Sequence, residues 1–204
     1  MSGARVVLAE DEALIRLDIK ESLIQEGYDV VGEASDGAEA VELVRELKPD
    51  LALLDIMMPG VDGLTATREI MSEQLAAVVI LTAYSQRDLV NQATEAGAMA
   101  YLVKPVRHDK LTPTLEVALA RFRQFVEMTD KADSLEKRLD NRRAVDRAKG
   151  VLMDEYGYSE QGSYRYVQQM AMTRRTNMKV VSDEILEGTL IPPPASEGEP
   201  ADES

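Results

Sequence analysis

Five polar residues follow short apolar runs in the amino-terminal part of the sequence, and their types suit one kind of chemistry. They are Glu10, Asp11, Asp55, Thr82 and Lys104. Three carboxylates that lie close together repel one another, which favours a bound hard cation with oxygen ligands, such as Mg²⁺. A hydroxyl and an ammonium group are suitable partners for phosphoryl oxygens. If the five residues converge, they predict phosphoryl transfer onto a carboxylate, which forms an acyl phosphate. The alternative is a cluster of ions with no chemistry.

The elements that would bring these residues together are short strands. Residues 51–55 pass from four apolar residues straight into Asp55, and a turn signal follows at Pro59-Gly60. Such a run predicts a strand that is buried on both faces and carries the carboxylate at its carboxyl end. An Asp at a strand end can also simply cap the next loop, so Asp55 does not decide the function alone.

Five such runs alternate with helical patterns along the amino-terminal part. The predicted strands are residues 5–9, 29–34, 51–55, 77–82 and 100–103. Short connections and right-handed crossovers then give an α/β fold, with one parallel sheet between helices. The carboxyl ends of parallel strands share one edge, where open α/β sheets bind ligands. We therefore expect the five polar residues to meet at that edge.

Taken together, these residues resemble the receiver domain of two-component response regulators. The resemblance covers residues 4 to about 125, and it rests on Glu10-Asp11, Asp55 with Pro59-Gly60 and Asp62-Gly63, Thr82-Ala83, Tyr101 and Lys104-Pro105. It implies a flavodoxin-like sheet in the order 2-1-3-4-5 and a cis bond before Pro105. It also implies that a sensor histidine kinase is a partner, and that its phosphohistidine transfers a phosphoryl group to Asp55.

The resemblance further implies a magnesium site around the phosphoacceptor. Asp11, Asp55 and the backbone carbonyl of Met57 would bind Mg²⁺ directly, and Glu10 would act mainly through water. The cofactor expected from the resemblance is therefore the same cation that the three carboxylates favour by themselves.

The remaining positions of the motif would stabilise the phosphoryl group and report its presence. By resemblance, Lys104, Thr82 and the backbone of Ala83 would contact the phosphoryl oxygens. Thr82 and Tyr101 would form the switch, in which Tyr101 rotates inward behind Thr82. The alternative for Tyr101 is an ordinary half-buried aromatic residue. His108, the single histidine, is expected in a surface loop without a role in the site.

A helical pattern begins near Asp109 and continues into the last third of the sequence. Pro113 lies close to its start and is tolerated only if it belongs to the first turn. Farther on, Met128, Ala132, Leu135 and Leu139 are spaced 4-3-4, as in a short coiled coil. We predict a self-associating helix over residues 126–141. The alternative is a helix that packs against its own domain.

Charge separates the last third from the rest of the chain. The net charge of the whole sequence is −14, yet residues 134–180 contain 10 basic and 6 acidic side chains, a net charge of +4. This asymmetry indicates an anionic partner for that segment, although a solvated surface of mixed charge is the alternative. The apolar spacing predicts three short amphipathic helices, and the second of them should turn Tyr164, Val167 and Ala171 inward.

These helices resemble the ANTAR domain, the RNA-binding module of AmiR/NasR-type transcription antiterminators. The resemblance covers about residues 135–188 and rests on Arg142-Arg143, residues 148–153, Tyr164, Ala171-Met172 and Val181. It implies that a homodimer binds paired RNA hairpins in nascent transcript leaders. The residues expected to contact RNA are Arg142, Arg143, Arg147, Lys149, Tyr164 and Arg165.

Small residues mark a departure from the ANTAR pattern. Gly162, Ser163 and Ser182 stand where that family usually has better helix formers or Ala. We expect them to weaken the second helix and its packing. Four tyrosines lie between residues 156 and 166, and at their helical spacing we expect most of them to belong to the core.

The predicted organisation has four parts. They are a receiver domain (1–125), a coiled-coil linker helix (126–141), an ANTAR domain (142–190) and a disordered acidic tail (191–204). We expect a phosphorylation-dependent transcription antiterminator without enzymatic output beyond its own phosphoryl chemistry. The alternative is an output domain that binds a protein partner or DNA. The third predicted helix, residues 178–187, has one Lys and three acidic residues, which argues against a DNA recognition helix.

Composition limits the remaining classes of function. The sequence has no cysteine, which excludes disulfides and thiolate zinc sites. It has no apolar run long enough to cross a membrane and no signal-type amino terminus. We therefore expect a cytoplasmic protein.

Overall fold

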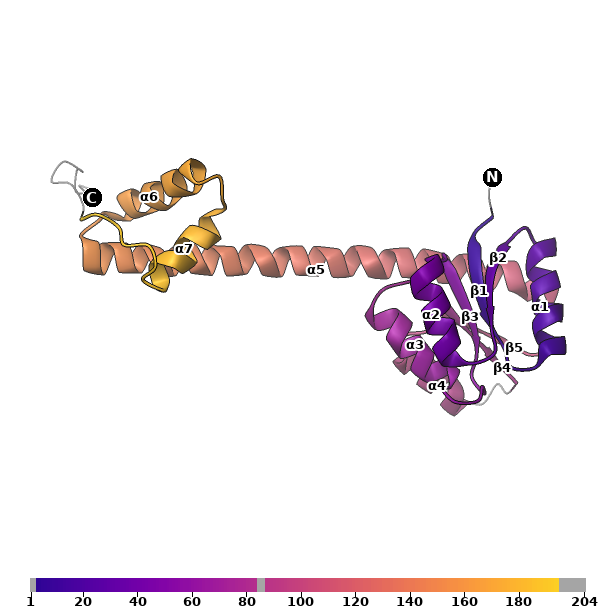
Figure 1. The fold of residues 1–204 in the computed structure, drawn as a ribbon. Coiled ribbons are helices and arrows are strands. Elements are labelled where there is room, and N and C mark those ends of the chain that lie inside the picture. The colour runs from indigo at the N-terminus through magenta and orange to yellow at the C-terminus, as the bar shows by residue number, and fades with distance from the viewer. Residues whose placement is uncertain (1–2, 84–86, 195–204) are drawn as a thin grey trace. The chain divides into compact units, whose positions relative to one another are not determined.

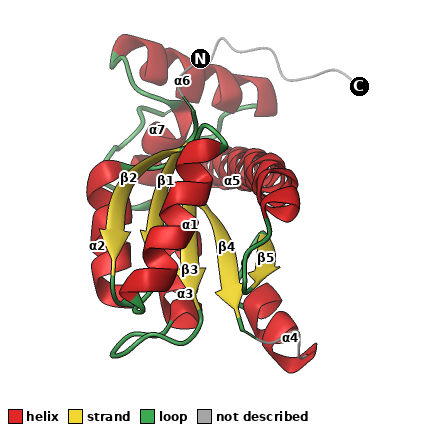
Figure 2. Cartoon of the chain, turned by 90° about the vertical axis from the view of Figure 1, so that its right-hand side faces the viewer, coloured by secondary structure: helices red, strands yellow, loops and turns green. Residues whose placement is uncertain are grey.

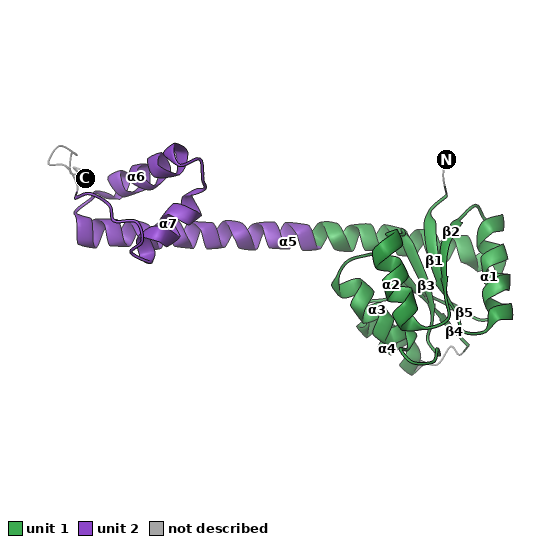
Figure 3. Ribbon diagram, in the orientation of Figure 1, with its two compact units in different colours: residues 1–128 green, residues 129–204 purple. Residues whose placement is uncertain are grey.

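The computed structural model describes residues 3–83 and 87–194 of the chain. The chain divides into two compact units, residues 1–128 and 129–204, which are shown in green and purple in Figure 3. The division falls inside the segment that we predicted as a linker helix. The two units are described one at a time below.

The first unit is built on a five-stranded parallel sheet. The strand order is β2-β1-β3-β4-β5, which confirms the predicted flavodoxin-like fold (Figure 2). The strands have the predicted bounds: β1 (Arg5–Ala9), β2 (Asp29–Ala34), β3 (Leu51–Asp55), β4 (Ala77–Thr82) and β5 (Ala100–Val103). All residues of β3 and β4 are buried, as expected for strands covered on both faces.

Helices cover both faces of the sheet. On one face the core contains residues of α2 (Gly37–Leu47), α3 (Gly63–Ser72) and α4 (Arg87–Glu95). On the other face it contains residues of α1 (Ala13–Gln25) and the start of α5 (His108–Tyr156). Each fully buried leucine in these layers contributes about 1.5–3 kcal/mol to folding. Figure 1 shows how these helices surround the strands.

The turn into α3 lies close to the carboxyl end of β3. Asp62 caps α3, because its Oδ1 accepts a hydrogen bond of 2.7 Å from the backbone N–H of Thr65. A Cβ atom at Gly63 would lie only 2.0 Å from the carbonyl oxygen of Asp55. Glycine is therefore required at position 63, since α3 begins directly against the strand end that carries Asp55.

Helix α5 differs from the sequence prediction at its start. It begins at His108, so Pro113 lies in the second turn and not in the first. The side chain of Pro113 is exposed, and water can bind the carbonyl of Asp109 that the missing N–H leaves without a helical partner. His108 is exposed as predicted, but it belongs to the helix and not to a loop.

The same helix continues through the predicted linker without a break. Met128, Leu135 and Leu139 have exposed side chains. These exposed side chains are available to a second helix, and self-association of this segment stays a prediction. Together with Ala132, which is also exposed, they keep the predicted 4-3-4 spacing and form an apolar stripe on α5 over the predicted coiled-coil segment.

The second unit is a small helical bundle. It combines the end of α5 with α6 (Glu160–Thr173) and α7 (Met178–Leu186). The buried core of the bundle consists of Ala148, Leu152, Val167, Ala171, Val181 and Ile185. Ser159 caps α6, and its Oγ accepts a hydrogen bond of 3.0 Å from the N–H of Gly162. Tyr156, Tyr158 and Tyr166 pack against the core, which confirms that most of the nearby tyrosines are structural.

The prediction for the inward face of α6 was wrong at one position. Tyr164 is 47% exposed, while Gly162 and Ser163 are buried. The Oγ atoms of Ser163 and Ser182 donate to backbone carbonyls one turn earlier, those of Ser159 and Met178. The small residues that we expected to weaken the packing are thus buried with their hydroxyls bonded.

The chain after α7 is described as far as Pro194. Pro192 is buried, and the hydroxyl of Tyr158 donates to the carbonyl of Pro193 at 2.9 Å. The first residues of the predicted tail are therefore attached to the bundle, and residues 195–204 lie outside the described part. Among the described residues, no helix has the length and apolar character needed to cross a membrane.

Candidate functional site

Three carboxylates from two strand ends form the acidic cluster of the first unit. One oxygen each from Glu10, Asp11 and Asp55 lies within 4.8 Å of the others. Glu10 and Asp55 are buried, whereas Asp11 is exposed. The sheet order places β1 beside β3, which is why residues 10 and 55 meet. The cluster therefore has two buried anions with an opening to solvent at Asp11.

Lys104 supplies the cation that partly neutralises this cluster. Its Nζ lies 3.0 Å from Oδ1 of Asp55 and 2.5 Å from Oε2 of Glu10. The backbone N–H of Lys104 donates to the carbonyl of Thr82 at 2.8 Å, so the strand ladder between β4 and β5 positions the residue. The peptide bond between Lys104 and Pro105 is cis, as the resemblance implied.

Burial sets the protonation of the cluster. Desolvation raises the pKa of the Asp55 carboxyl above its ordinary value, although the hydrogen bond from Lys104 opposes this rise. Desolvation likewise raises the pKa of Glu10, again against the effect of Lys104. Burial lowers the pKa of Lys104, but its hydrogen bonds to the two carboxylates outweigh burial, and the net shift is upward. Added positive charge at this site would therefore favour the ionised carboxylates.

The remaining predicted residues of the receiver part lie on β4 and β5 or shortly after β3 and β4. Thr82 is buried at the end of β4, and Ala83 follows it at the same edge of the sheet. Met57 lies two residues after Asp55, with an exposed side chain. Tyr101 on β5 is 44% exposed, so its ring is not buried behind Thr82 in this structure. The inward rotation that the resemblance implies therefore stays a prediction.

The acidic cluster suits Mg²⁺ by its chemistry. All three side chains offer oxygen atoms, the ligands that this hard cation prefers, and one member of the cluster is open to water. Burial raises the pKa values of Glu10 and Asp55, and a divalent cation held by the cluster would favour their ionised forms.

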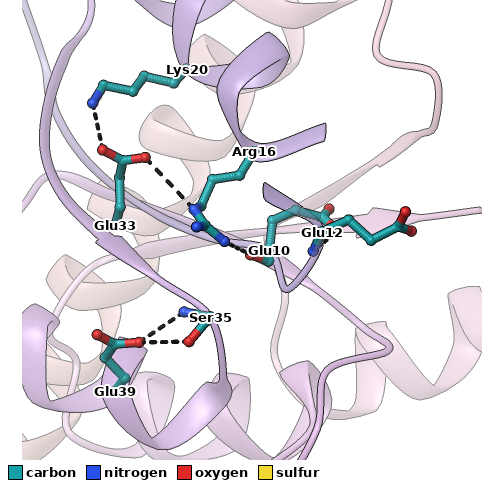
Figure 4. A network of polar contacts seen from close by, with 7 residues as sticks. All are labelled: Glu10, Glu12, Arg16, Lys20, Glu33, Ser35 and Glu39. Carbon is teal, nitrogen blue, oxygen red and sulfur yellow. Dashed lines mark hydrogen bonds and ion pairs between the residues drawn. The ribbon is translucent and has the colours of Figure 1, made fainter. Parts of the chain in front are cut away.

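Sequence reasoning missed a second layer of contacts behind the cluster. Arg16 of α1 donates through Nη1 to the backbone carbonyl of Glu10, and its Nε lies 3.7 Å from Oε2 of Glu33 on β2. Lys20 also pairs with Glu33 (Figure 4). The sequence offers one signal, a basic residue one turn into the helix that follows the acidic pair, but it does not identify the partner on β2.

The second unit carries the residues predicted to contact RNA. Arg142, Arg143, Arg147 and Arg165 are exposed. Lys149 is different, because only 17% of its side chain is exposed and its Nζ pairs with Glu160 at 2.8 Å. The structure thus leaves four of the predicted basic residues accessible. Arg142 and Arg143 each lie 3.9 Å from an aspartate of the same helix, whereas Lys149 is held in a closer and less exposed ion pair.

Tyr164 and Lys149 lie between two hollows on the surface of the second unit, and both residues line each hollow. One hollow, of about 490 Å³, is lined by both residues together with Arg142, Asn177 and Lys179 among others. The other, of about 400 Å³, is lined by both residues with Glu160, Arg165 and Gln168 among others. An exposed aromatic ring with cations on either side suits unstacked bases and phosphates. We call this surface, around Tyr164 and Lys149, the basic face.

Comparison with known proteins accounts for both units. Residues 6–116 match the response regulator receiver domain, and residues 133–186 match the ANTAR domain. The chain belongs to the response regulators. It is a response regulator with an ANTAR output domain, and it is 50% identical over 183 residues to the transcriptional regulatory protein PdtaR of Mycobacterium tuberculosis. That similarity covers 90% of this chain and 89% of PdtaR.

Other relatives of this response regulator share the receiver domain. The chemotaxis protein CheY of Thermotoga maritima is 39% identical over 114 residues, which cover 55% of this chain and 95% of CheY. The solved receiver domain of NarL from M. tuberculosis is 35% identical with a TM-score of 0.55, over 58% of this chain and 98% of that one. A solved complex of CheX, CheY, BeF₃ and Mg²⁺ from Borrelia burgdorferi is 28% identical with a TM-score of 0.52, over 58% and 89%.

Proposed function

We propose that this response regulator is switched by phosphorylation of Asp55 and acts as an RNA-binding transcription antiterminator. One observation carries the first half of the proposal: the ammonium group of Lys104 lies 3.0 Å from Oδ1 of Asp55, beside two further carboxylates. A buried acceptor, a cation and a cluster of oxygen ligands are the parts that phosphoryl transfer to a carboxylate requires.

The receiver part would accept the phosphoryl group from a phosphohistidine of a sensor histidine kinase. A carboxylate oxygen of Asp55 forms the new bond to phosphorus, and the bond between phosphorus and the histidine nitrogen breaks. The leaving imidazole keeps that electron pair and takes up a proton. Mg²⁺, when bound by Asp11, Asp55 and the carbonyl of Met57 with Glu10 acting through water, would neutralise phosphoryl oxygens. The solved complex of a related CheY contains Mg²⁺ and BeF₃, which supports this assignment.

The groups around Asp55 would hold the product and report it. Lys104 would pair with the phosphoryl oxygens, and the hydroxyl of Thr82 and the backbone of Ala83 would bond them. Movement of Thr82 toward the phosphoryl group leaves space for the exposed ring of Tyr101 to turn inward. The charge added at Asp55 would in this way change the surface formed by β4, β5 and their helices.

The basic face of the second unit would bind RNA. Arginine and lysine side chains contact phosphates, and an exposed tyrosine stacks on unpaired bases. On this face Arg142 and Arg165 with Tyr164 supply both kinds of contact, and the exposed Arg143 and Arg147 add cations from a neighbouring hollow that is also lined by Lys179. The exposed 4-3-4 stripe on α5 supports a homodimer that would present two such faces to paired hairpins. PdtaR is named as a transcriptional regulator, which agrees with this output.

The test of the first half is phosphorylation of the full-length protein by a small phosphodonor. The wild type should become labelled in a manner that depends on Mg²⁺, and Asp55→Asn should not. Asp133→Asn makes the same change at an exposed position of α5 and should behave as the wild type. Stable labelling of Asp55→Asn at the wild-type level would show that another residue is the acceptor.

The test of the second half is crosslinking of the full-length protein to cellular RNA, followed by sequencing. Recovered hairpins should bind in a salt-dependent way, and the pair Arg143→Glu with Lys149→Glu should abolish binding. Phosphodonor should strengthen binding of the wild type but not of Asp55→Asn. If no RNA is bound at any salt concentration, an output domain that binds a protein partner is the better reading. Preferential binding of duplex DNA would favour the DNA alternative.

A further inference from the structure

We propose that Arg16 is a positioning residue, which holds the Glu10-Asp11 segment in the geometry that Mg²⁺ binding requires. The inference rests on the proposed function, because Glu10 and Asp11 are proposed magnesium residues. Arg16 itself would contact neither the metal nor the phosphoryl group. It would act through the backbone that joins the two acidic residues.

The contacts of Arg16 connect two strands at the edge that carries the site. Its Nη1 donates to the carbonyl oxygen of Glu10 at the end of β1, and its Nε lies 3.7 Å from Oε2 of Glu33 on β2. Only 22% of the Arg16 side chain is exposed. Figure 4 shows the guanidinium group between the two residues. Because the planar guanidinium group has a partner at each of two edges, its orientation is fixed. The carbonyl oxygen that it binds is therefore held in place as well.

The bonded carbonyl is the one that determines where Asp11 points. The carbonyl of Glu10 belongs to the peptide plane that continues into Asp11, so fixing this oxygen fixes the plane. The N–H of Glu10 is also held, because it donates to the carbonyl of Ala34 at 3.1 Å. The backbone N–H of Arg16 donates to the carbonyl of Glu12 at 2.9 Å, which anchors the far side of the same turn. Among these three bonds, only the contact to the Glu10 carbonyl comes from a side chain and can be removed by substitution.

Lys20 provides a matched comparison within the same network. It lies one turn after Arg16 on α1 and pairs with Oε1 of Glu33. Among the described contacts, Lys20 has none with Glu10. Replacing either residue by Met therefore removes one positive charge and one partner of Glu33, but only the change at Arg16 releases the carbonyl of Glu10.

Electrostatics and positioning predict opposite results for Arg16→Met. By Coulomb's law alone, loss of a cation near three carboxylates strengthens the attraction of the site for Mg²⁺. Loss of a group that orients a ligand segment weakens metal binding, typically by about 10–100-fold. The sign of the change in affinity therefore separates a positioning role from a purely electrostatic one.

The experiment measures the dissociation constant for Mg²⁺ of the full-length protein by calorimetric titration, for the wild type, Arg16→Met and Lys20→Met. We expect Arg16→Met to bind Mg²⁺ about tenfold more weakly or worse, and Lys20→Met to bind as the wild type or slightly more tightly. With a small phosphodonor, Arg16→Met should need correspondingly more Mg²⁺ for half its maximal rate, while the rate at saturating Mg²⁺ stays close to the wild type. Unfolding temperatures in the presence of a chelator check that the variants are folded.

Three results would overturn the inference, and they differ from a failure of the proposed function. Wild-type Mg²⁺ affinity in Arg16→Met overturns it, and so does equal weakening in Arg16→Met and Lys20→Met. If Arg16→Met does not fold, Arg16→Lys is used, because a single ammonium group cannot reach Glu10 and Glu33 as the guanidinium does. Wild-type affinity in that variant is the third overturning result. Absence of Mg²⁺ binding or phosphorylation in the wild type would instead remove the proposed function, and the inference with it.

Discussion

The ammonium group of Lys104 lies 3.0 Å from Oδ1 of Asp55 and so connects the carboxyl ends of β5 and β3. Strand β4 lies between them in the sheet, and its last residue is Thr82. A cation, a hydroxyl and the proposed acceptor carboxylate thus come from three successive strands of the sheet. Lys104 therefore supplies part of the positive charge that a bound metal ion would bring, because it pairs with two buried carboxylates.

The first prediction concerns removal of this cation. In the absence of Mg²⁺, Lys104→Met should lower the free energy of unfolding by roughly 3 kcal/mol, because it leaves Glu10 and Asp55 buried without their positive partner. Mg²⁺ should restore more stability to this variant than to the wild type. Urea unfolding with and without Mg²⁺ measures both effects, and Lys110→Met is the control at an exposed position. Equal stability of Lys104→Met and the wild type without Mg²⁺ would contradict the prediction.

The second prediction concerns pH. Folding raises the pKa values of Glu10 and Asp55, mainly by desolvation. The stability contributed by these groups is therefore fully present below the ordinary carboxyl values near pH 4, and it is lost as the pH rises through the raised values. Mg²⁺ needs the ionised form, so its affinity should increase over the same interval, by about tenfold per pH unit for each proton released.

This pH dependence is measured by calorimetric titration of Mg²⁺ between pH 4.5 and about 8, in buffers with different heats of ionisation that report proton release. Asp55→Asn should release fewer protons than the wild type. An affinity that stays constant across the interval would show that neither carboxylate binds the metal.

The sequence predicted the sheet well because its signals are local. Each strand is a short apolar run that ends at a polar residue or turn, and residues 51–55 show this most clearly. The convergence of Glu10, Asp55 and Lys104 followed from strand direction alone, since parallel strands share one carboxyl edge. The contact of Arg16 with Glu33 could not be predicted, because it depends on how α1 lies over β2.

The bundle shows where periodicity alone was insufficient. Tyr164 fits a helical spacing with Val167 and Ala171, and this spacing alone predicted an inward position. In the structure, Ser163 is buried instead, with its hydroxyl bonded to the carbonyl of Ser159. Apolar spacing does not reveal such a site. A small polar residue can be buried in a helix when its hydroxyl donates a hydrogen bond to a backbone carbonyl one turn earlier.

The third prediction concerns the ion pair between Lys149 and Glu160. The hydrogen bond from Lys149 lowers the pKa of the Glu160 carboxyl, so Glu160 is ionised at neutral pH. An RNA phosphate that contacts Lys149 must replace this carboxylate. Glu160→Gln should therefore raise the affinity for RNA by about two- to fivefold. It should also release about one more counterion on binding, which is measured as a steeper dependence of the affinity on salt concentration.

A double-mutant cycle separates this local effect from a general change of charge. In the background Lys149→Gln, the substitution Glu160→Gln should no longer raise RNA affinity beyond the effect of Glu136→Gln, the same change at an exposed position of α5. Weaker binding by Glu160→Gln alone would mean that Glu160 orients Lys149 for RNA and does not compete with it.

The fourth prediction compares two tyrosines on the same helix. Tyr164 is exposed between the two hollows of the basic face, whereas Tyr166 packs in the bundle core with its ring centroid 5.5 Å from that of Tyr158. Tyr164→Ala should weaken RNA binding by about 1–3 kcal/mol, the usual value of stacking on one base, and should leave the unfolding temperature nearly unchanged. Tyr166→Ala should lower the stability of the bundle by about 2–3 kcal/mol.

The two variants are compared by RNA titration and by thermal unfolding of the full-length protein, with Tyr164→Phe as a further control. Tyr164→Phe keeps the ring and should bind RNA within about twofold of the wild type, since stacking needs the aromatic face and not the hydroxyl. If Tyr164→Phe binds as weakly as Tyr164→Ala, the hydroxyl makes the decisive contact and stacking does not. If Tyr164→Ala binds RNA as the wild type does, the bases lie elsewhere, and the basic face contacts phosphates alone.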